Sequence, residues 1–298
     1  MVKEFIASIS NLLDLCKLKV VALILLTAVV GMFLAVPAPY FPDWLLVVNA
    51  SLGIGMAAAS AAVFNHVVDE KIDTQMSRTD QRPLPQGKVS RYQALIWGVF
   101  LGVIGLGILQ LFVNTLTMIL TFASLIGYAV IYTLYLKRAT PQNIVIGGAA
   151  GAAPPVLGWT AITGGQNIES ALLLFLIVFI WTPPHFWALA IHRVKEYEKA
   201  DIPMLPVTHG IAYTKVQILF YTILLVVVTI LPYLTGMSGL IYLTAALILG
   251  GIFLWYAINI NSRSKDIKIA WNTFTYSINY LMLLFLALLV DHYWLITL

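Results

Sequence analysis

Residues 44–64 read WLLVVNASLGIGMAAASAAVF, and residues 65–73 continue the chain as NHVVDEKID. The first stretch carries no charge and has the ~20 residues that a helix needs to cross a bilayer. The second stretch is polar and places Asn65, Asp69 and Asp73 at intervals of four residues. Because positions i, i+4 and i+8 share one helix face, these three side chains, called here the acidic stripe, are predicted to project together at the end of a membrane span.

The whole chain has the composition of a polytopic membrane protein. Of its 298 residues, 60% are hydrophobic and 10% are charged, whereas a soluble domain has about 25% charged residues. The mean hydropathy is +0.91. We therefore predict an all-α fold with nine transmembrane helices, and a single domain over residues 1–298 because no long polar linker divides it. The nine apolar segments lie at about 19–36, 44–64, 93–113, 115–136, 141–162, 170–191, 214–234, 238–258 and 271–290.

The positive charges predict how these spans are oriented. All 17 Lys and Arg lie before or at the start of the first span, or at 65–91, 137–138, 192–215 and 263–268. Since Lys and Arg collect on the cytoplasmic side, we expect the N-terminus and the long loops 65–91 and 192–213 in the cytoplasm and the C-terminus in the periplasm. The net charge of +4 follows from this topology and calls for no nucleic-acid partner.

The first residues predict a surface helix. Apolar residues recur at helical spacing, so residues 1–18 are expected to form an amphipathic helix on the cytoplasmic face. The segment lacks both a small-residue cleavage site and arginine, unlike a secretory signal or a mitochondrial presequence. These features favour a multi-pass protein of a bacterial inner membrane.

The acidic stripe is expected to bind a divalent cation. Two carboxylates on one face repel each other unless a cation lies between them, and Mg²⁺ prefers carboxylate and amide oxygens. The alternative is a solvated loop, but acids do not set membrane topology. Four basic side chains follow the stripe or end the fourth span: Arg78, Arg82, Lys137 and Arg138. Such a setting suits a magnesium-bound diphosphate, which guanidinium groups bind bidentately.

The second long loop begins with histidines. Span six ends in WTPPHFW at 181–187, so His185 and His192 lie seven residues apart on one helix face. Ionisable residues inside a membrane bundle are functional candidates, and a histidine can bind a haem iron or move a proton. The alternative is a satisfied polar residue at 185 and an interfacial one at 192. The sequence does not choose between these roles.

The pattern Asn65-x3-Asp69-x3-Asp73 at the cytoplasmic end of span two resembles that of the UbiA-type intramembrane prenyltransferases. Most members carry a second aspartate-rich motif after span six. This chain instead has PHFW at 184–187 and ADIPMLP at 200–206. Together with YTLYLKR at 132–138 and GAAGAAPP at 148–155, these elements resemble the branch of the family that farnesylates protohaem IX.

The resemblance implies a UbiA-type bundle capped by the two long loops. The implied reaction moves a farnesyl group from farnesyl diphosphate to a vinyl group of haem B, giving haem O and diphosphate. The acidic stripe would be catalytic and would hold Mg²⁺, the four basic residues would bind the diphosphate, and His185 or His192 would bind haem. A terminal oxidase or a haem A synthase is the implied protein partner. The sequence predicts no oligomeric state.

Two other functions fit parts of the sequence. A prenyltransferase for an aromatic quinone precursor predicts a second acidic motif where His185 and His192 stand. A haem-binding membrane carrier or transporter explains the spans and the histidines but not the acidic stripe beside arginines. Both are therefore disfavoured.

Overall fold

The structure of the chain, a computed structural model, describes residues 2–76, 79–262 and 267–294. All regular secondary structure in this part is helical, which confirms the predicted all-α class. The elements of the first half are α1 Val2–Leu15, α2 Leu18–Leu34, α3 Trp44–Asp73, α4 Arg91–Phe112, α5 Thr115–Ile126, the π-helix η1 Gly127–Leu136, α6 Lys137–Ala139, α7 Asn143–Ala152 and α8 Pro154–Thr163. Those of the second half are α9 Ile168–His192, α10 Val194–Lys199, α11 Leu205–Thr208, α12 Gly210–Val228, α13 Leu231–Leu234, α14 Leu240–Ser262 and α15 Ile267–Tyr293.

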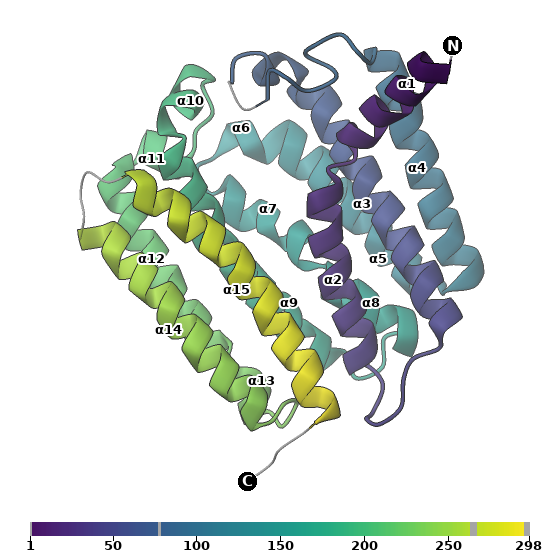
Figure 1. Cartoon of the computed structure of the whole chain (residues 1–298), viewed down its shortest axis with the longest axis vertical. Coiled ribbons are helices and arrows are strands. Elements are labelled where there is room, and N and C mark those ends of the chain that lie inside the picture. The colour runs from purple at the N-terminus through teal and green to yellow at the C-terminus, as the bar shows by residue number, and fades with distance from the viewer. Residues whose placement is uncertain (1, 77–78, 263–266, 295–298) are drawn as a thin grey trace.

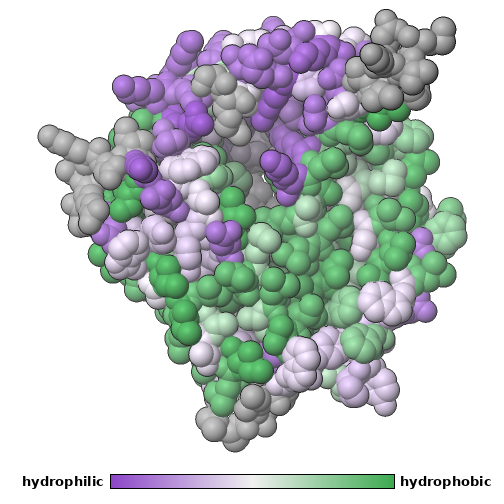
Figure 2. Space-filling model, viewed as in Figure 1, coloured by the Kyte–Doolittle hydropathy of each residue, from purple (hydrophilic) through white to green (hydrophobic). Residues whose placement is uncertain are grey.

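The long helices stand side by side in one bundle, with their polar connections gathered at one end (Figure 1). The N-terminus, the connection after α3, and α10 and α11 lie at that end, whereas the C-terminus lies at the opposite end (Figure 1). Figure 2 shows hydrophilic residues concentrated at the first end and a broad hydrophobic surface below them. This distribution matches a bundle whose flanks face lipid and whose polar end faces water.

Within the described residues, eight helical segments are long and apolar enough to cross a membrane. The number rises to nine when the bent pair Ile9–Leu15 and Leu18–Leu34, which meet at 55°, counts as one span. The first predicted span therefore differs from the others, since α2 alone has 17 residues. The bend falls at Lys17, whose backbone is left-handed with φ 51°. A left-handed residue ends the run of helical hydrogen bonds.

Two spans change their winding. The fourth passes from α5 into η1, and the fifth is divided between α7 and α8 at Pro154, because proline has no N–H to continue the helix. By contrast, α9 runs through Pro183 and Pro184 as one helix. The change from α5 to η1 bears on the site, because Thr133 and Lys137 both contact the end of α3.

The interior depends on close contact between α2 and α8. A Cβ on Gly158 would lie 1.9 Å from the backbone oxygen of Ala28, and one on Gly31 would lie 2.4 Å from that of Pro155. Small residues let membrane helices approach in this way. This contact fixes α2, and with it Lys17, against the rest of the bundle.

Candidate functional site

The acidic stripe occupies the last turns of α3 at the polar end of the bundle, as predicted. Asn65, Asp69 and Asp73 are 5%, 3% and 3% exposed. The Asn65 amide donates to Asp69 Oδ2 at 2.8 Å. A solvated loop leaves carboxylates in water, so their burial contradicts that alternative. Buried carboxylates need partners of opposite charge or a metal.

Two of the predicted basic residues provide such partners. Lys137 Nζ lies 2.6 Å from Asp69 Oδ2, and Arg82 donates to Asp73 Oδ2 at 2.7 Å. Lys137 reaches the stripe from the start of α6, directly after η1, and Arg82 from the loop after α3. The two carboxylates are therefore each paired with a cation.

The other two predicted basic residues are not brought to the stripe. Arg138 is exposed and makes no ion pair or hydrogen bond with the described residues. Arg78 lies outside the described residues. Lys137 and Arg138 are adjacent in a helix, and adjacent side chains point to different faces. Only Lys137 therefore points toward the stripe.

A third cation, not recognised from the sequence, completes the set. Lys17 Nζ donates to Asn65 Oδ1 at 2.5 Å from the break between α1 and α2. Burial, with the charge of Arg82 beside it, lowers the pKa of Lys17 to about 7. Burial is the larger cause and the neighbouring cations add to it, so an anionic ligand here would stabilise the charged ammonium. Because the positive-inside rule alone explains a lysine at this position, the sequence does not indicate that Lys17 contacts the stripe.

Two further residues lie beside the stripe: His66, which the sequence places next to the stripe but off its face, and Thr133, which sequence reasoning missed. His66 is buried, and its Nδ1 lies 4.0 Å from Asp73 Oδ2 although it is off the predicted face. Thr133, from η1, accepts a hydrogen bond from the Asn65 amide at 3.4 Å. The i, i+4 spacing along α3 predicts neither contact, because His66 lies on a neighbouring face of α3 and Thr133 comes from a distant segment.

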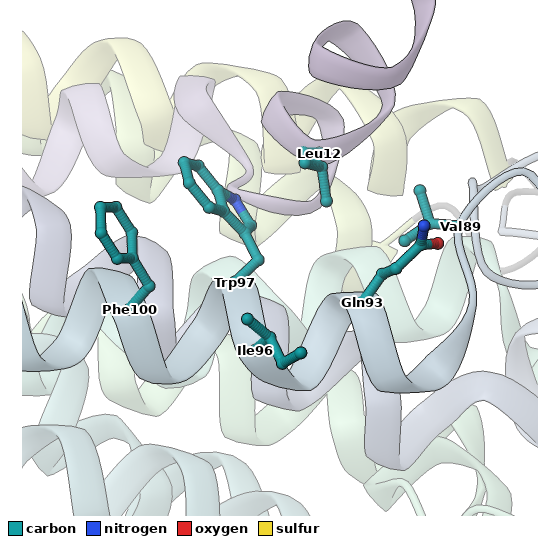
Figure 3. A pocket seen from close by; sticks show the side chains of 6 residues that line it. All are labelled: Leu12, Val89, Gln93, Ile96, Trp97 and Phe100. Carbon is teal, nitrogen blue, oxygen red and sulfur yellow. The ribbon is translucent and has the colours of Figure 1, made fainter. Parts of the chain in front are cut away.

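A cavity of about 300 Å³ opens beside these groups. Its lining residues are Asp14, Lys17, His66, Gln81, Arg82 and Pro83. A second cavity, of about 380 Å³, lies between α1 and α4 and is lined by Leu12, Val89, Gln93, Ile96, Trp97 and Phe100 (Figure 3). The second cavity has no titratable lining residue, so charge-dependent chemistry belongs to the first.

The stripe has the donor set for Mg²⁺. Asp69 Oδ1 is buried and has no hydrogen-bond partner among the described residues, which leaves one carboxylate oxygen for a ligand. In the described ranges no three His, Cys, Asp or Glu side chains group closely enough to form a complete metal cage. Mg²⁺ does not need one, since it commonly takes one or two carboxylates and completes its shell with water and phosphate oxygens. The residues therefore fit Mg²⁺ held together with a diphosphate.

The two histidines both face α15 but differ in their surroundings. His185 is buried, its Nδ1 lies 2.6 Å from Ser277 Oγ, and its ring stacks on Trp181 and Phe274 with centroids 4.2 and 4.6 Å away. This is the environment of a satisfied core histidine. His185 therefore has a structural explanation.

His192 lies nearer the polar end and is half-buried. Its ring is tilted against Trp271 at a centroid distance of 5.1 Å. Its Nδ1 is buried without a hydrogen-bond partner among the described residues. A buried unpaired ring nitrogen is costly, so His192 is the better placed of the two to take a ligand.

The second loop offers no replacement for an acidic motif at the stripe. Glu196, on α10, pairs at 2.5 Å with Arg193, the residue before that helix. Asp201 is exposed at a left-handed position with φ 51°. Neither residue joins Asp69 and Asp73 in a metal cluster within the described part of the chain.

The chain is similar to known proteins over most of its length. A model of the UbiA prenyltransferase family matches residues 24–295. A protein from Ruthia magnifica named protoheme IX farnesyltransferase is 78% identical over 288 residues, covering 97% of this chain and 96% of its own. A protein of the same name from Methylococcus capsulatus is 61% identical over 281 residues, covering 94% and 93%.

Solved structures share the fold at low sequence identity. A digeranylgeranylglyceryl phosphate synthase superposes with a TM-score of 0.79 at 20% identity, covering 97% of this chain and 99% of its own. A UbiA homologue from Archaeoglobus fulgidus, bound to GPP and Mg²⁺, gives 0.63 at 15% identity, covering 93% and 99%.

Proposed function

The chain belongs to the UbiA prenyltransferase family, and on that premise we propose that it transfers a farnesyl group from farnesyl diphosphate to a vinyl group of haem B. The products are haem O, with its hydroxyethylfarnesyl side chain, and diphosphate. Relatives named protoheme IX farnesyltransferase support the choice of both substrates. Membership of the family makes the chain a prenyltransferase, and the site suggests how it handles the diphosphate.

One observation carries the proposal. Lys17, Arg82 and Lys137 converge on the buried acidic stripe, one cation on each of its three members. A buried ion pair costs desolvation that its own attraction barely repays, so this accumulation is hard to explain as a stabilising device. A magnesium-bound diphosphate would use every group, because its oxygens attract the cations while its metal takes the carboxylates.

The reaction breaks the bond between farnesyl C1 and a diphosphate oxygen, and both electrons leave on the oxygen. The electrons of the haem vinyl group then form the new carbon–carbon bond, and water adds to the resulting cation with loss of a proton. Bound Mg²⁺ supplies charge neutralisation on the leaving diphosphate. Asn65, Asp69 and Asp73 are the groups that would hold it.

The chain's own cations act on the same charge. Lys137, Arg82 and Lys17 are placed to turn from the stripe onto phosphate oxygens, where they balance the negative charge that grows as the bond breaks. Preorganised charges of this kind are the largest single contribution in many enzymes. Arg78, from the same loop as Arg82, is proposed to assist, whereas the position of Arg138 gives it no direct part.

For the acceptor, we place His192 rather than His185 against the haem. His192 is half-buried near the polar end and has an unpaired Nδ1, whereas His185 is enclosed by aromatic rings and Ser277. An imidazole nitrogen is a common axial ligand of haem iron. The role is binding and orientation of the acceptor.

We also propose the orientation and setting in the cell. The N-terminus and the connections rich in Lys and Arg lie at one end of the bundle (Figure 1), and the positive-inside rule puts that end in the cytoplasm of a bacterial inner membrane. Both substrates would then be loaded from the cytoplasmic leaflet. Haem O would pass to a terminal oxidase or a haem A synthase.

The test is a reaction with purified protein, haem B, farnesyl diphosphate and Mg²⁺ under reducing conditions, with products identified by mass. We expect a farnesylated haem and diphosphate, and no product when a chelator removes the metal. Absence of any farnesyl–haem adduct in the complete mixture would overturn the proposal. Prenylation of an added aromatic acid in its place would favour the quinone-precursor reaction.

A further inference from the structure

The helix that faces the acidic stripe changes its winding at Gly127. Buried residues recur every fourth position along α5 and η1: Thr117, Thr121, Leu125, Ala129 and Thr133. In an α-helix, with 3.6 residues per turn, such a repeat drifts around the axis. The wider turn of η1, closed by i→i+5 hydrogen bonds, rotates the repeat back. The π-helix therefore keeps Thr133 facing the interior and lets Lys137, four residues later, reach Asp69.

Thr133 uses its hydroxyl in two ways. The side chain is 0% exposed. Its Oγ1 donates to the carbonyl oxygen of Tyr128 at 2.7 Å, inside η1. A hydroxyl has one proton to donate, so this bond leaves Oγ1 as an acceptor toward the Asn65 amide, 3.4 Å away.

The Thr133 hydroxyl, as an acceptor, influences whether the oxygen or the nitrogen of the Asn65 amide is available to a metal. The Asn65 nitrogen donates to Asp69 Oδ2 and to Thr133, and its oxygen accepts from Lys17. The reverse orientation would set the amide oxygen against a carboxylate oxygen and the hydroxyl lone pairs. Only the amide oxygen is a ligand for a hard cation. The contacts thus decide whether Asn65 can take part in metal binding.

We propose that Thr133 is a positioning residue for the prenyl-transfer reaction. Held by the π-helix, its hydroxyl acts with Asp69 as an acceptor for the Asn65 amide nitrogen, which leaves the amide oxygen, paired here with Lys17, as the atom offered to the metal. The inference rests on the proposed function, since it concerns the same Mg²⁺ site. It adds a residue whose effect is transmitted through Asn65 rather than by touching the substrate.

The test measures binding of Mn²⁺, as a spectroscopic substitute for Mg²⁺, to the full-length protein in nanodiscs with inorganic diphosphate present. Thr133→Val removes the hydroxyl at similar size, and Thr133→Ser keeps it. Thr121→Val is the matched control, because Thr121 is 3% exposed on the same span and its hydroxyl has no partner among the described residues.

We expect Thr133→Val to weaken Mn²⁺ binding about tenfold, as loss of a group that orients a metal ligand commonly does. Thr133→Ser and Thr121→Val should bind Mn²⁺ like the unmodified protein. Equal binding by Thr133→Val and the unmodified protein overturns the inference. So does equal loss in Thr133→Ser and Thr133→Val, because packing rather than the hydroxyl would then matter.

A second background separates positioning from folding. In Asn65→Asp both side-chain oxygens are equivalent, so no amide orientation has to be fixed. Adding Thr133→Val to Asn65→Asp should then leave Mn²⁺ binding unchanged, a coupling that a double-mutant cycle measures. A loss as large as in the native background contradicts the inference. If the unmodified protein itself binds no Mn²⁺, the proposed metal site fails, which is a distinct result.

Discussion

Lys137 and Asp69 form a nearly dehydrated ion pair, with Nζ 2.6 Å from Oδ2 and the two side chains 13% and 4% exposed. The pair joins the start of α6, directly after η1, to the acidic stripe on α3. Removing charges from water costs several kcal/mol per ion, and among the described residues neither group forms a second salt bridge. The pair therefore keeps the Lys137 ammonium at the point where a diphosphate would bind.

Lys137→Met is expected to lower kcat/KM for farnesyl diphosphate by roughly 100-fold or more, the usual effect of removing one preorganised donor to a developing negative charge. The methionine keeps the length of the side chain, so packing changes little. Steady-state kinetics on purified protein give the measurement. Lys88→Met, at an exposed lysine of the first loop, is the control and should stay within about twofold. Equal effects of the two substitutions would show that Lys137 has no special role.

Asp69→Asn and Asp73→Asn should each reduce turnover by roughly 1000-fold, since a metal contributes several kcal/mol of charge stabilisation. Asparagine has the same shape as aspartate but removes the charge. Haem binding, followed by the haem absorption band, should remain largely intact because the histidines lie on another helix. Full activity in either variant refutes the metal role, and loss of haem binding in both would show a folding defect instead.

Features that depend on local spacing were predictable from the sequence. The spans and the face shared by Asn65, Asp69 and Asp73 follow from hydropathy and the i, i+4 rule, and the structure has both. Contacts between distant segments were not predictable. Lys17 is 48 positions from Asn65, and Thr133 is 68. Their approach depends on the break before α2 and on the π winding of η1.

His192→Ala should shift the absorption band of bound haem, because an unpaired imidazole near the polar end is the better candidate for an iron ligand. His185→Ala should leave the band largely unchanged but lower the stability by about 1–3 kcal/mol, since it removes buried ring contacts and a hydrogen bond. Spectral titration with haem and thermal unfolding separate the two effects. His209→Ala, at an exposed histidine, is the spectral control. A shifted band in His185→Ala alone would reverse the assignment.

Gly158→Ala tests whether the contact between α2 and α8 holds the bundle together. The added methyl group would lie 1.9 Å from the backbone oxygen of Ala28, and no flexible side chain can move aside to relieve the overlap. Overpacking a well-packed site costs about 1–3 kcal/mol and sometimes more, and here α2 would have to shift as a whole. We therefore expect a marked fall in folded yield and unfolding temperature.

Gly107→Ala is the matched control, because its Cβ would meet nothing within 4 Å, and replacing a helical glycine by alanine is favourable by about 0.5–1 kcal/mol. Thermal unfolding in nanodiscs compares the two. If both variants unfold at the same temperature as the native chain, α2 is free to move relative to α8, and the position of Lys17 beside Asn65 is not fixed by that contact.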